Sequence, residues 1–264
     1  MSTRKAVKGL LPKPLPAVRS VSVRIPKHKL GNFPLMQHTR SIIRDRNIDT
    51  VIDVGANRGQ FGRFLRDDVG YCGPIISFEP LPHAFEVLQK EAQGDVNWKV
   101  FNVAIGRCRG TLPFNVMASD DFSSFKHPNR DNLFRGSNEV VAQLEVKVDR
   151  LDQLIPAERF SFHRAFLKMD TQGYDLDVLF GADGLLDQIQ AVQTELSFLP
   201  IYDAMPSFEH VLRELAARGF AISGMYPITL TKLQAVECDC LLVREARATP
   251  GDYITYQDLL LSSM

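Results

Sequence analysis

An apolar run that ends in an acidic residue and a glycine turn is the first place in the sequence that suggests chemistry. Residues 50–54 are followed by Gly55, Asn57 and Gly59, so that the pattern from Asp53 reads Asp-x-Gly-x-x-x-Gly. In a parallel sheet flanked by helices, such a turn lies at the carboxyl end of its strand and leaves backbone N–H groups free to bind a ligand. The sequence therefore predicts a ligand site at this turn.

The spacing of the glycines argues against two common nucleotide ligands. A dinucleotide-binding turn has Gly-x-Gly-x-x-Gly, but Asn57 occupies the second glycine position, where its side chain would obstruct a pyrophosphate. The Gly-Lys-Ser/Thr of a triphosphate-binding loop does not occur at this turn either. NAD and ATP are therefore disfavoured as ligands.

A second acidic residue stands at the end of the next apolar run. Glu79 follows residues 74–78, and a carboxylate at this place can accept hydrogen bonds from both hydroxyls of a ribose. Asp53 and the bare backbone of Gly55 suit the ammonium-bearing tail of an amino acid. A ribose joined to an amino acid is S-adenosylmethionine, which these residues predict as the cofactor. The alternative is a plain tight turn at Gly55 and a solvated carboxylate at Glu79.

A sheet whose strands alternate with helices has to position these residues. From about residue 38 onward, short apolar runs alternate with helical patterns, which is typical of a mostly parallel sheet with helices on both faces. Ser207 is expected to cap one of the helices. The strands that we expect in this sheet cover residues 50–54, 74–78, 98–105, 165–170, 191–196, 220–225 and 238–243.

An insertion interrupts the alternation between the third and fourth strands. Residues 111–116 and 145–148 have strand patterns, and a polar stretch, 119–131, lies between them. A long loop inside a compact domain is usually functional or disordered, so we expect an inserted loop at 107–148 near the site. Asp120 and Asp121 in it are interpreted as loop charges without a role.

The composition is ordinary for a globular protein. Of 264 residues, 45% are hydrophobic and 23% are charged, and the 31 basic residues equal the 31 acidic ones in number. This balance gives no electrostatic argument for a nucleic-acid partner, and no apolar run approaches the length of a membrane span. The cysteines have no spacing typical of a zinc site, so we expect reduced thiols and a cytoplasmic location. They are Cys72, Cys108, Cys238 and Cys240.

The first 36 residues are expected to form a basic, proline-containing arm. The first 30 contain eight basic residues and no acidic one, and four prolines interrupt any helix. We interpret the arm as a mobile tail; a lid over the site, or contact with a second subunit or an anionic lipid surface, is the alternative. Residues 37–264 are expected to form the folded domain. Without the arm the chain is net acidic, which disfavours nucleic acid as a substrate.

A series of motifs runs in order through the chain. They are VIDVGANRGQF (51–61), SFEPLPHAFEVL (77–88), NVAIG (102–106), Ser123-Ser124, VDRLDQL (148–154), LKMDTQGYDLDVLFGA (167–182) and QTELSFLPIY (193–202). With these motifs the chain resembles the FkbM-type S-adenosylmethionine-dependent methyltransferases over roughly residues 40–245. The resemblance implies a doubly wound, Rossmann-like class I methyltransferase of the α/β class, with a seven-stranded, mostly parallel sheet whose last strand is antiparallel. It also implies methylation of hydroxyl groups, often of sugars or polyketide-type natural products.

The resemblance also implies places for the cofactor-binding residues. The amino-acid end is expected to be lined by Asp53, Gly55, Asn57 and Gly59, the ribose to be held by Glu79, the adenine to lie by Ala104, and the serine pair Ser123 and Ser124 to lie over the cofactor. One position departs from the family pattern. Gln172 stands where the family usually has an acidic residue, so a role for a carboxylate is not expected there.

Methyl transfer to a hydroxyl requires that the acceptor oxygen be aligned and lose its proton. Asp170 ends the fourth strand and Glu195 lies near the end of the fifth, so we expect both to face the transferred methyl group and to position the acceptor, one as a base. Mg²⁺ between them is possible but no metal ligand is predicted. An ion pair of Glu195 with Lys168 is another alternative. We therefore expect an O-methyltransferase of a small molecule. The alternatives are a non-catalytic protein that binds S-adenosylmethionine or another nucleoside, and a methyltransferase that acts on a macromolecule.

Overall fold

The computed structural model of the chain describes residues 32–129, 133–134 and 137–245. Most of the predicted arm, residues 1–31, lies outside these ranges. Residues 33–36 were assigned to the arm, but they form the first turn of helix α1 (Phe33–Asp45). Pro34 is compatible with this helix because the first-turn N–H groups have no partner within a helix. The compact unit described below begins at Phe33.

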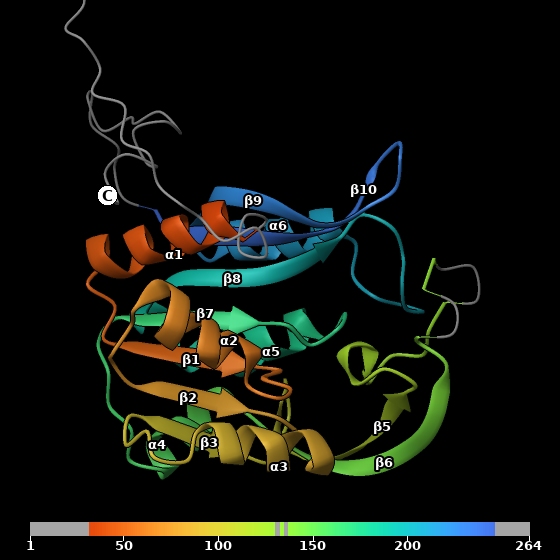
Figure 1. Cartoon of the computed structure of the whole chain (residues 1–264), viewed down its shortest axis with the longest axis horizontal. Coiled ribbons are helices and arrows are strands. Elements are labelled where there is room, and N and C mark those ends of the chain that lie inside the picture. Colours follow the sequence, from red (N-terminus) through yellow and green to blue (C-terminus); the bar gives the residue numbers. More distant parts are fainter. Residues whose placement is uncertain (1–31, 130–132, 135–136, 246–264) are drawn as a thin grey trace, which may run out of the picture. The chain divides into compact units, whose positions relative to one another are not determined.

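Seven strands form the main sheet, in the order β3-β2-β1-β7-β8-β10-β9 (Figure 1). The pairs among β3, β2, β1, β7 and β8 are parallel, and β10 is antiparallel to both of its neighbours. This arrangement confirms the predicted α/β class I methyltransferase fold with an antiparallel last strand. The strands are β1 (Thr50–Val54), β2 (Ile75–Phe78), β3 (Trp98–Phe101), β7 (Ala165–Met169), β8 (Ile189–Ser197), β9 (Phe220–Leu230) and β10 (Ala235–Arg244).

Helices cover both faces of the main sheet because its inner strands are apolar on both sides. All five residues of β1 are buried: Val51 packs in one core cluster, whereas Ile52 and Val54 pack in the other. Ser207 caps the last helix by accepting a hydrogen bond from the His210 N–H, as predicted. No helix among the described residues is long and apolar enough to cross a membrane. One face carries α1, α2 (Gln60–Arg63) and α3 (Pro82–Glu91), and the other α4 (Leu151–Ala157), α5 (Asp175–Gly181) and α6 (Phe208–Ala217) (Figure 1).

Three short helical elements complete the fold. The π-helical turn η2 (Phe64–Val69) continues directly from α2, and the 3₁₀ turn η4 (Asp183–Gln188) follows α5. The third, the 3₁₀ turn η3 (Asp120–Phe122), belongs to the inserted segment.

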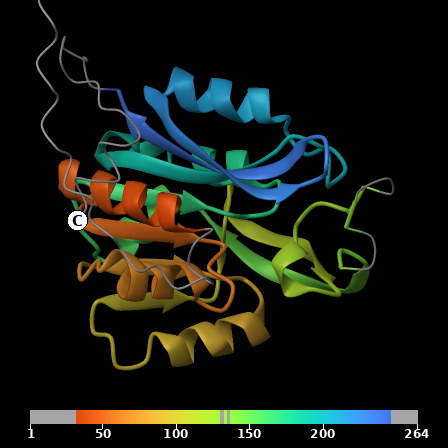
Figure 2. The same ribbon diagram turned by 45° about the horizontal axis from the view of Figure 1, so that its top comes forward.

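The inserted segment supplies β5 and most of β6 to a second sheet of three strands, in the order β4-β6-β5. Its strands are β4 (Ala104–Ile105), β5 (Gly110–Met117) and β6 (Val140–Asp149), and the β5–β6 pair extends beyond the ends of the central strands (Figure 2). One prediction was wrong here. The strand expected at 98–105 is divided, because β4 leaves the main sheet to pair with β6. The strand patterns expected at 111–116 and 145–148 correspond to β5 and β6, which are longer than predicted and pair over eight positions.

Candidate functional site

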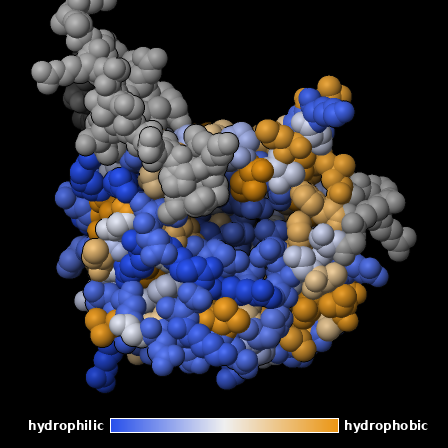
Figure 3. Space-filling view, in the orientation of Figure 1, coloured by the Kyte–Doolittle hydropathy of each residue, from blue (hydrophilic) through white to orange (hydrophobic). Residues whose placement is uncertain are grey.

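A cavity of about 250 Å³ lies at the edge where β2, β1, β7 and β8 end. The carboxyl ends of parallel strands meet at one edge of a sheet, so the turns that follow these strands come together there. In Figure 3 the surface is hollowed in this region, and hydrophilic residues predominate around the hollow. Seven of the residues predicted for the site line the cavity: Gly55, Asn57, Glu79, Ala104, Ser123, Asp170 and Glu195.

The turn after β1 depends on Gly55. Its φ is +78°, and a Cβ atom at this position would lie 1.9 Å from the backbone oxygen of Asp170. Its N–H and that of Ala56 both donate to the carbonyl of Phe78, which ties the turn to the end of β2. Only glycine therefore lets the turn approach the end of β7 this closely. The other predicted glycine, Gly59, does not line the cavity; an added Cβ there would press on Leu88 and Trp98, so its place is in helix packing.

Glu79 joins the turns after β1 and β2. Its carboxylate accepts the Asn57 N–H at 2.8 Å through Oε2 and the Leu81 N–H at 2.8 Å through Oε1. The side chain is almost fully buried, and burial raises the pKa of Glu79 to about 7 although both N–H groups favour the charged form. Each carboxylate oxygen has two lone pairs, so Glu79 can still accept hydrogen bonds from the hydroxyl groups of a ligand.

The buried carboxyl of Glu79 is expected to make the protein less stable as the pH rises from 5 to 7. The pKa of Glu79 is about 7 in the folded protein, compared with an ordinary value of 4.5 in the unfolded chain. Between these values the folded protein holds a proton that the unfolded chain has released. The unfolded state binds fewer protons, and the free energy of unfolding therefore falls with pH. Glu79→Gln should reduce this fall by about 2 kcal/mol. Urea unfolding of both proteins at pH 5, 6 and 7 measures it, and equal slopes would contradict the assignment.

Asp53 is buried behind the cavity wall and does not line the cavity, so the expectation that it faces the ligand was wrong. It is fully buried, its Oδ2 accepts the Ser77 hydroxyl at 3.1 Å, and its Oδ1 lies 3.4 Å from Lys168 Nζ. Ser77 and Lys168 are its register partners on β2 and β7, so the three side chains lie on one face of the sheet. A buried carboxylate needs such partners, and Lys168 takes the position at the cavity wall.

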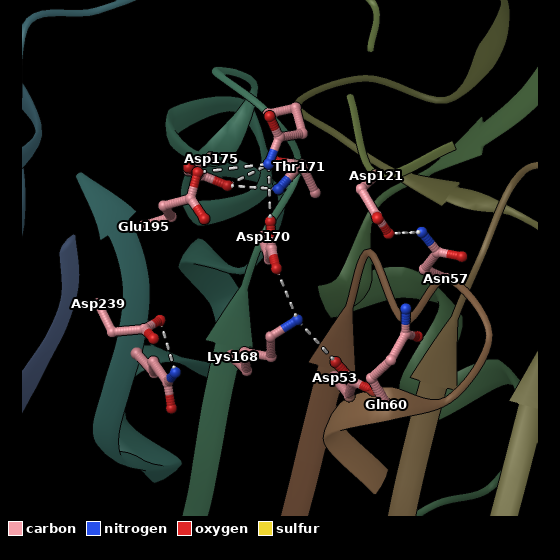
Figure 4. Close-up of polar contacts among 12 residues, drawn as sticks. Asp53, Asn57, Gln60, Asp121, Lys168, Asp170, Thr171, Asp175, Glu195 and Asp239 are labelled. Atoms are coloured by element: carbon pink, nitrogen blue, oxygen red, sulfur yellow. Dashed lines mark hydrogen bonds and ion pairs between the residues drawn. The ribbon is translucent and has the colours of Figure 1, made fainter. Parts of the chain in front are cut away.

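Lys168 bridges two carboxylates (Figure 4). Its Nζ lies 3.4 Å from Asp53 Oδ1 and 3.2 Å from Asp170 Oδ2. Burial alone would lower the pKa of Lys168, but Asp170 and Asp53 outweigh this effect and raise it. The ammonium is therefore charged at any ordinary pH. The alternative that Lys168 pairs with Glu195 is not what the structure shows.

Gln172 connects the two candidate catalytic carboxylates. Its Nε2 donates to Asp170 Oδ1 at 3.2 Å and to Glu195 Oε1 at 3.3 Å, and its Oε1 lies 2.8 Å from the Tyr202 hydroxyl. Burial, followed by the charges of Asp170 and Glu237, raises the pKa of Glu195 well above 4.5. A neutral amide at position 172 thus supplies donors where an acid would add a third negative charge. The sequence pattern showed the substitution but not this contact.

The turn η3 is fastened across the cavity by the two aspartates that were taken for loop charges. Asp121 Oδ1 accepts the Asn57 side-chain N–H at 2.8 Å, while Asp120 pairs with Arg58 at 2.5 Å and with His83 at 2.8 Å. Both aspartates line the cavity and have polar partners, which the interpretation as plain loop charges did not foresee. Their position close before the serine pair, with only Phe122 between, was the available signal.

The two serines of the predicted pair have different positions, and only Ser123 reaches the cavity. Ser123 lines the cavity, and its hydroxyl accepts the Met117 N–H. Ser124 is fully buried and does not line the cavity; its hydroxyl donates to the Gln172 carbonyl at 2.7 Å. Ser124 therefore joins the inserted segment to the turn after β7. Within residues 32–129, 133–134 and 137–245, no group of three or more His, Cys, Asp or Glu side chains is arranged to hold a metal ion.

Solved structures similar to this chain include several methyltransferases. The methyltransferase FkbM from Methylobacillus flagellatus is 15% identical with a TM-score of 0.46, and the match covers 75% of this chain and 44% of that one. The rRNA methylase from Streptococcus thermophilus is 12% identical (TM-score 0.42; 78% and 93% covered), and fibrillarin from Aeropyrum pernix, with natively bound S-adenosyl-L-methionine, is 11% identical (TM-score 0.44; 74% and 66% covered). The chain thus spans less than half the length of the FkbM structure.

A family comparison agrees with the motifs found in the sequence. No curated protein matches the chain. The family model described as the methyltransferase FkbM domain matches residues 53–222, which is more than half of the 264 residues and includes the turns after β1, β2, β7 and β8. The predicted family is therefore confirmed, and the chain belongs to the FkbM methyltransferases.

Proposed function

We propose that the chain transfers a methyl group from S-adenosylmethionine to a hydroxyl group of a small molecule, and that this acceptor is a sugar or a glycosylated natural product. The observation that carries the proposal is the placement of Glu79 and the bare Gly55 turn on the wall of one cavity, in a chain of the FkbM family. Glu79 supports the binding of a ribose, and Gly55 gives the ligand access to backbone.

The polar atoms around the cavity fit this cofactor. Asn57 Oδ1 is buried and has no hydrogen-bond partner in the described part of the chain. Because Asn57 Nδ2 donates to Asp121, the orientation of the amide is fixed, and Oδ1 remains as an acceptor for a ligand N–H or O–H. Asn57, Glu79 and Ser123 are therefore proposed as cofactor contacts, and Ala104 as a neighbour of the adenine. Gly59, Ser124 and Asp53 are proposed to support the site from behind its wall.

Glu195 is proposed to take the proton of the acceptor hydroxyl, and Asp170 to help position that hydroxyl. The bound cofactor supplies an activated methyl group, so the protein has to align the acceptor and remove its proton. Asp170 already pairs with Lys168 through Oδ2. Glu195 lines the cavity with its carboxylate close to Gln172, and its raised pKa makes it a stronger base than an ordinary glutamate.

Glu195→Gln is therefore expected to lower kcat by about 10²- to 10⁴-fold while leaving the affinity for S-adenosylmethionine nearly unchanged. The test incubates the protein with the cofactor and a library of sugars and glycosides, and follows the mass gain of one methyl group. Since Glu195 has to be deprotonated, kcat should rise with pH through an apparent pKa above 4.5. Glu86→Gln, on an exposed face of α3, is the matched control. A Glu195→Gln variant that is as active as the control would contradict the role.

A cytoplasmic location belongs to the same proposal. Cys72, Cys108, Cys238 and Cys240 are all free thiols, which fits a reducing compartment. A nucleic-acid acceptor is not proposed, because the chain outside its basic N-terminal segment is net acidic. A contact of the N-terminal arm with a second subunit, or a lid role for it, also stands as a proposal.

A further inference from the structure

The cavity wall carries many acids and one base. Among the described lining residues the carboxylates are Glu79, Asp120, Asp121, Asp170 and Glu195, whereas Lys168 is the one cationic side chain. An anionic group that enters this cavity is therefore repelled by most of the wall. It can be stabilised by an opposite charge only beside Lys168.

The position of Lys168 is fixed by a row of polar residues that crosses the sheet. Ser77, Asp53 and Lys168 are register neighbours on β2, β1 and β7, and all three are buried. Trp98 Nε1–H donates to Ser77 Oγ at 3.0 Å, and the Ser77 hydroxyl donates to Asp53 at 3.1 Å. The Lys168 ammonium also lies 5.3 Å from the ring centre of Phe61. This row of hydrogen bonds and ion pairs holds the Lys168 ammonium at the cavity wall from the side of the sheet.

Lys168 keeps a donor for a ligand. An ammonium has three N–H groups, and the two neighbouring carboxylates, on Asp53 and Asp170, engage at most two of them. Asp53 does not line the cavity, so it balances the charge of Lys168 from the side away from the ligand. Asp170, the other partner of Lys168, lines the cavity itself, so a ligand would reach the remaining N–H beside Asp170.

We propose that Lys168 binds the α-carboxylate of the amino-acid tail of S-adenosylmethionine, and that Asp53 is a positioning residue that acts through Lys168 without touching the ligand. This inference rests on the proposed function, since it names how that cofactor is held. The tail brings an ammonium together with its carboxylate, so its entry adds no net charge to the site. Asp53 thereby changes from the predicted ligand contact into the support of the residue that makes the contact.

The test compares two ligands that differ by one group. S-adenosylhomocysteine and its decarboxylated analogue, which keeps the amine, are titrated calorimetrically into the full-length wild type, into Lys168→Met and into Lys99→Met. Lys99 is exposed on β3 and is the matched control. In the wild type and the control, loss of the ligand carboxylate should weaken binding by about 10- to 100-fold, the range of a charge-assisted hydrogen bond. In Lys168→Met the two ligands should differ by less than about 3-fold.

Equal weakening in Lys168→Met and wild type would overturn the inference and leave the proposed function intact, whereas absence of binding of S-adenosylhomocysteine to the wild type would remove both. Because Lys168→Met leaves Asp53 buried without its cation, Asp53→Asn/Lys168→Met serves as a second variant in which neither charge is present. The comparison of the two ligands in the wild type is also a test by itself. Equal affinity of the wild type for both ligands would overturn the inference whichever variants fold.

Discussion

Gly55→Ala is expected to lower the free energy of unfolding by about 4 kcal/mol or more and to abolish cofactor binding. The added Cβ would lie 1.9 Å from the backbone oxygen of Asp170, and φ at this position is +78°. Since the obstacle is backbone, no side-chain rotation can relieve the clash, and the turn after β1 would have to move away from β7. That movement would separate Gly55 and Asp170, which line the same cavity.

Gly70→Ala separates the clash from the cost of the backbone conformation. Gly70 has the same φ of +78°, but an added Cβ would meet nothing within 4 Å. Its substitution should therefore cost only about 1 kcal/mol, for the left-handed conformation alone. Unfolding by urea, followed by the fluorescence of Trp98, measures both variants; the chain has no second tryptophan. Equal losses of stability in the two variants would show that the close approach of Gly55 to β7 is not real.

Glu79→Ala is expected to weaken the binding of S-adenosylhomocysteine by at least about 100-fold. The substitution removes the proposed ribose acceptor and leaves the N–H groups of Asn57 and Leu81 without the carboxylate that they now bond at 2.8 Å. The turns after β1 and β2 therefore lose their connection at the same time. Calorimetric titration of the folded variant gives the change in affinity.

Glu79→Gln is the matched variant for this measurement. Its side-chain oxygen can accept from one backbone N–H, but its NH₂ group cannot replace the second acceptor. We therefore expect an affinity between those of the wild type and Glu79→Ala. An affinity for S-adenosylhomocysteine that is unchanged in Glu79→Ala would exclude Glu79 as the residue that holds the ribose.

The inner strands β1, β2 and β7 could be predicted from the sequence because their residues are buried on both faces. The run at 50–54 is buried throughout, and its bounds were predicted as the structure has them. The strand at 98–105 was predicted as continuous because hydrophobicity does not reveal the partner of a strand. Ala104 and Ile105 bond to β6, more than 40 positions away, and only this pairing shows that the chain has left the main sheet.

The site could be predicted in part, because a motif gives the order of residues along the chain and not the direction of each side chain. Glu79 was placed at a strand end and lines the cavity. Asp53, one residue before the end of its strand, lies on a covered face of the sheet, where its charge is balanced by Lys168 on a strand more than 100 residues later. A lysine within an otherwise apolar strand was the signal for that pair, since a buried lysine requires a partner.

Calorimetric titration of the full-length wild type with S-adenosylmethionine and with S-adenosylhomocysteine tests the central claim most directly. We expect both ligands to bind at one site per chain with dissociation constants in the micromolar range, about −8 kcal/mol, and each to raise the midpoint of thermal unfolding. Absence of heat and of thermal stabilisation with both ligands would contradict the assignment of the cavity between Glu79 and Glu195 as a site for this cofactor.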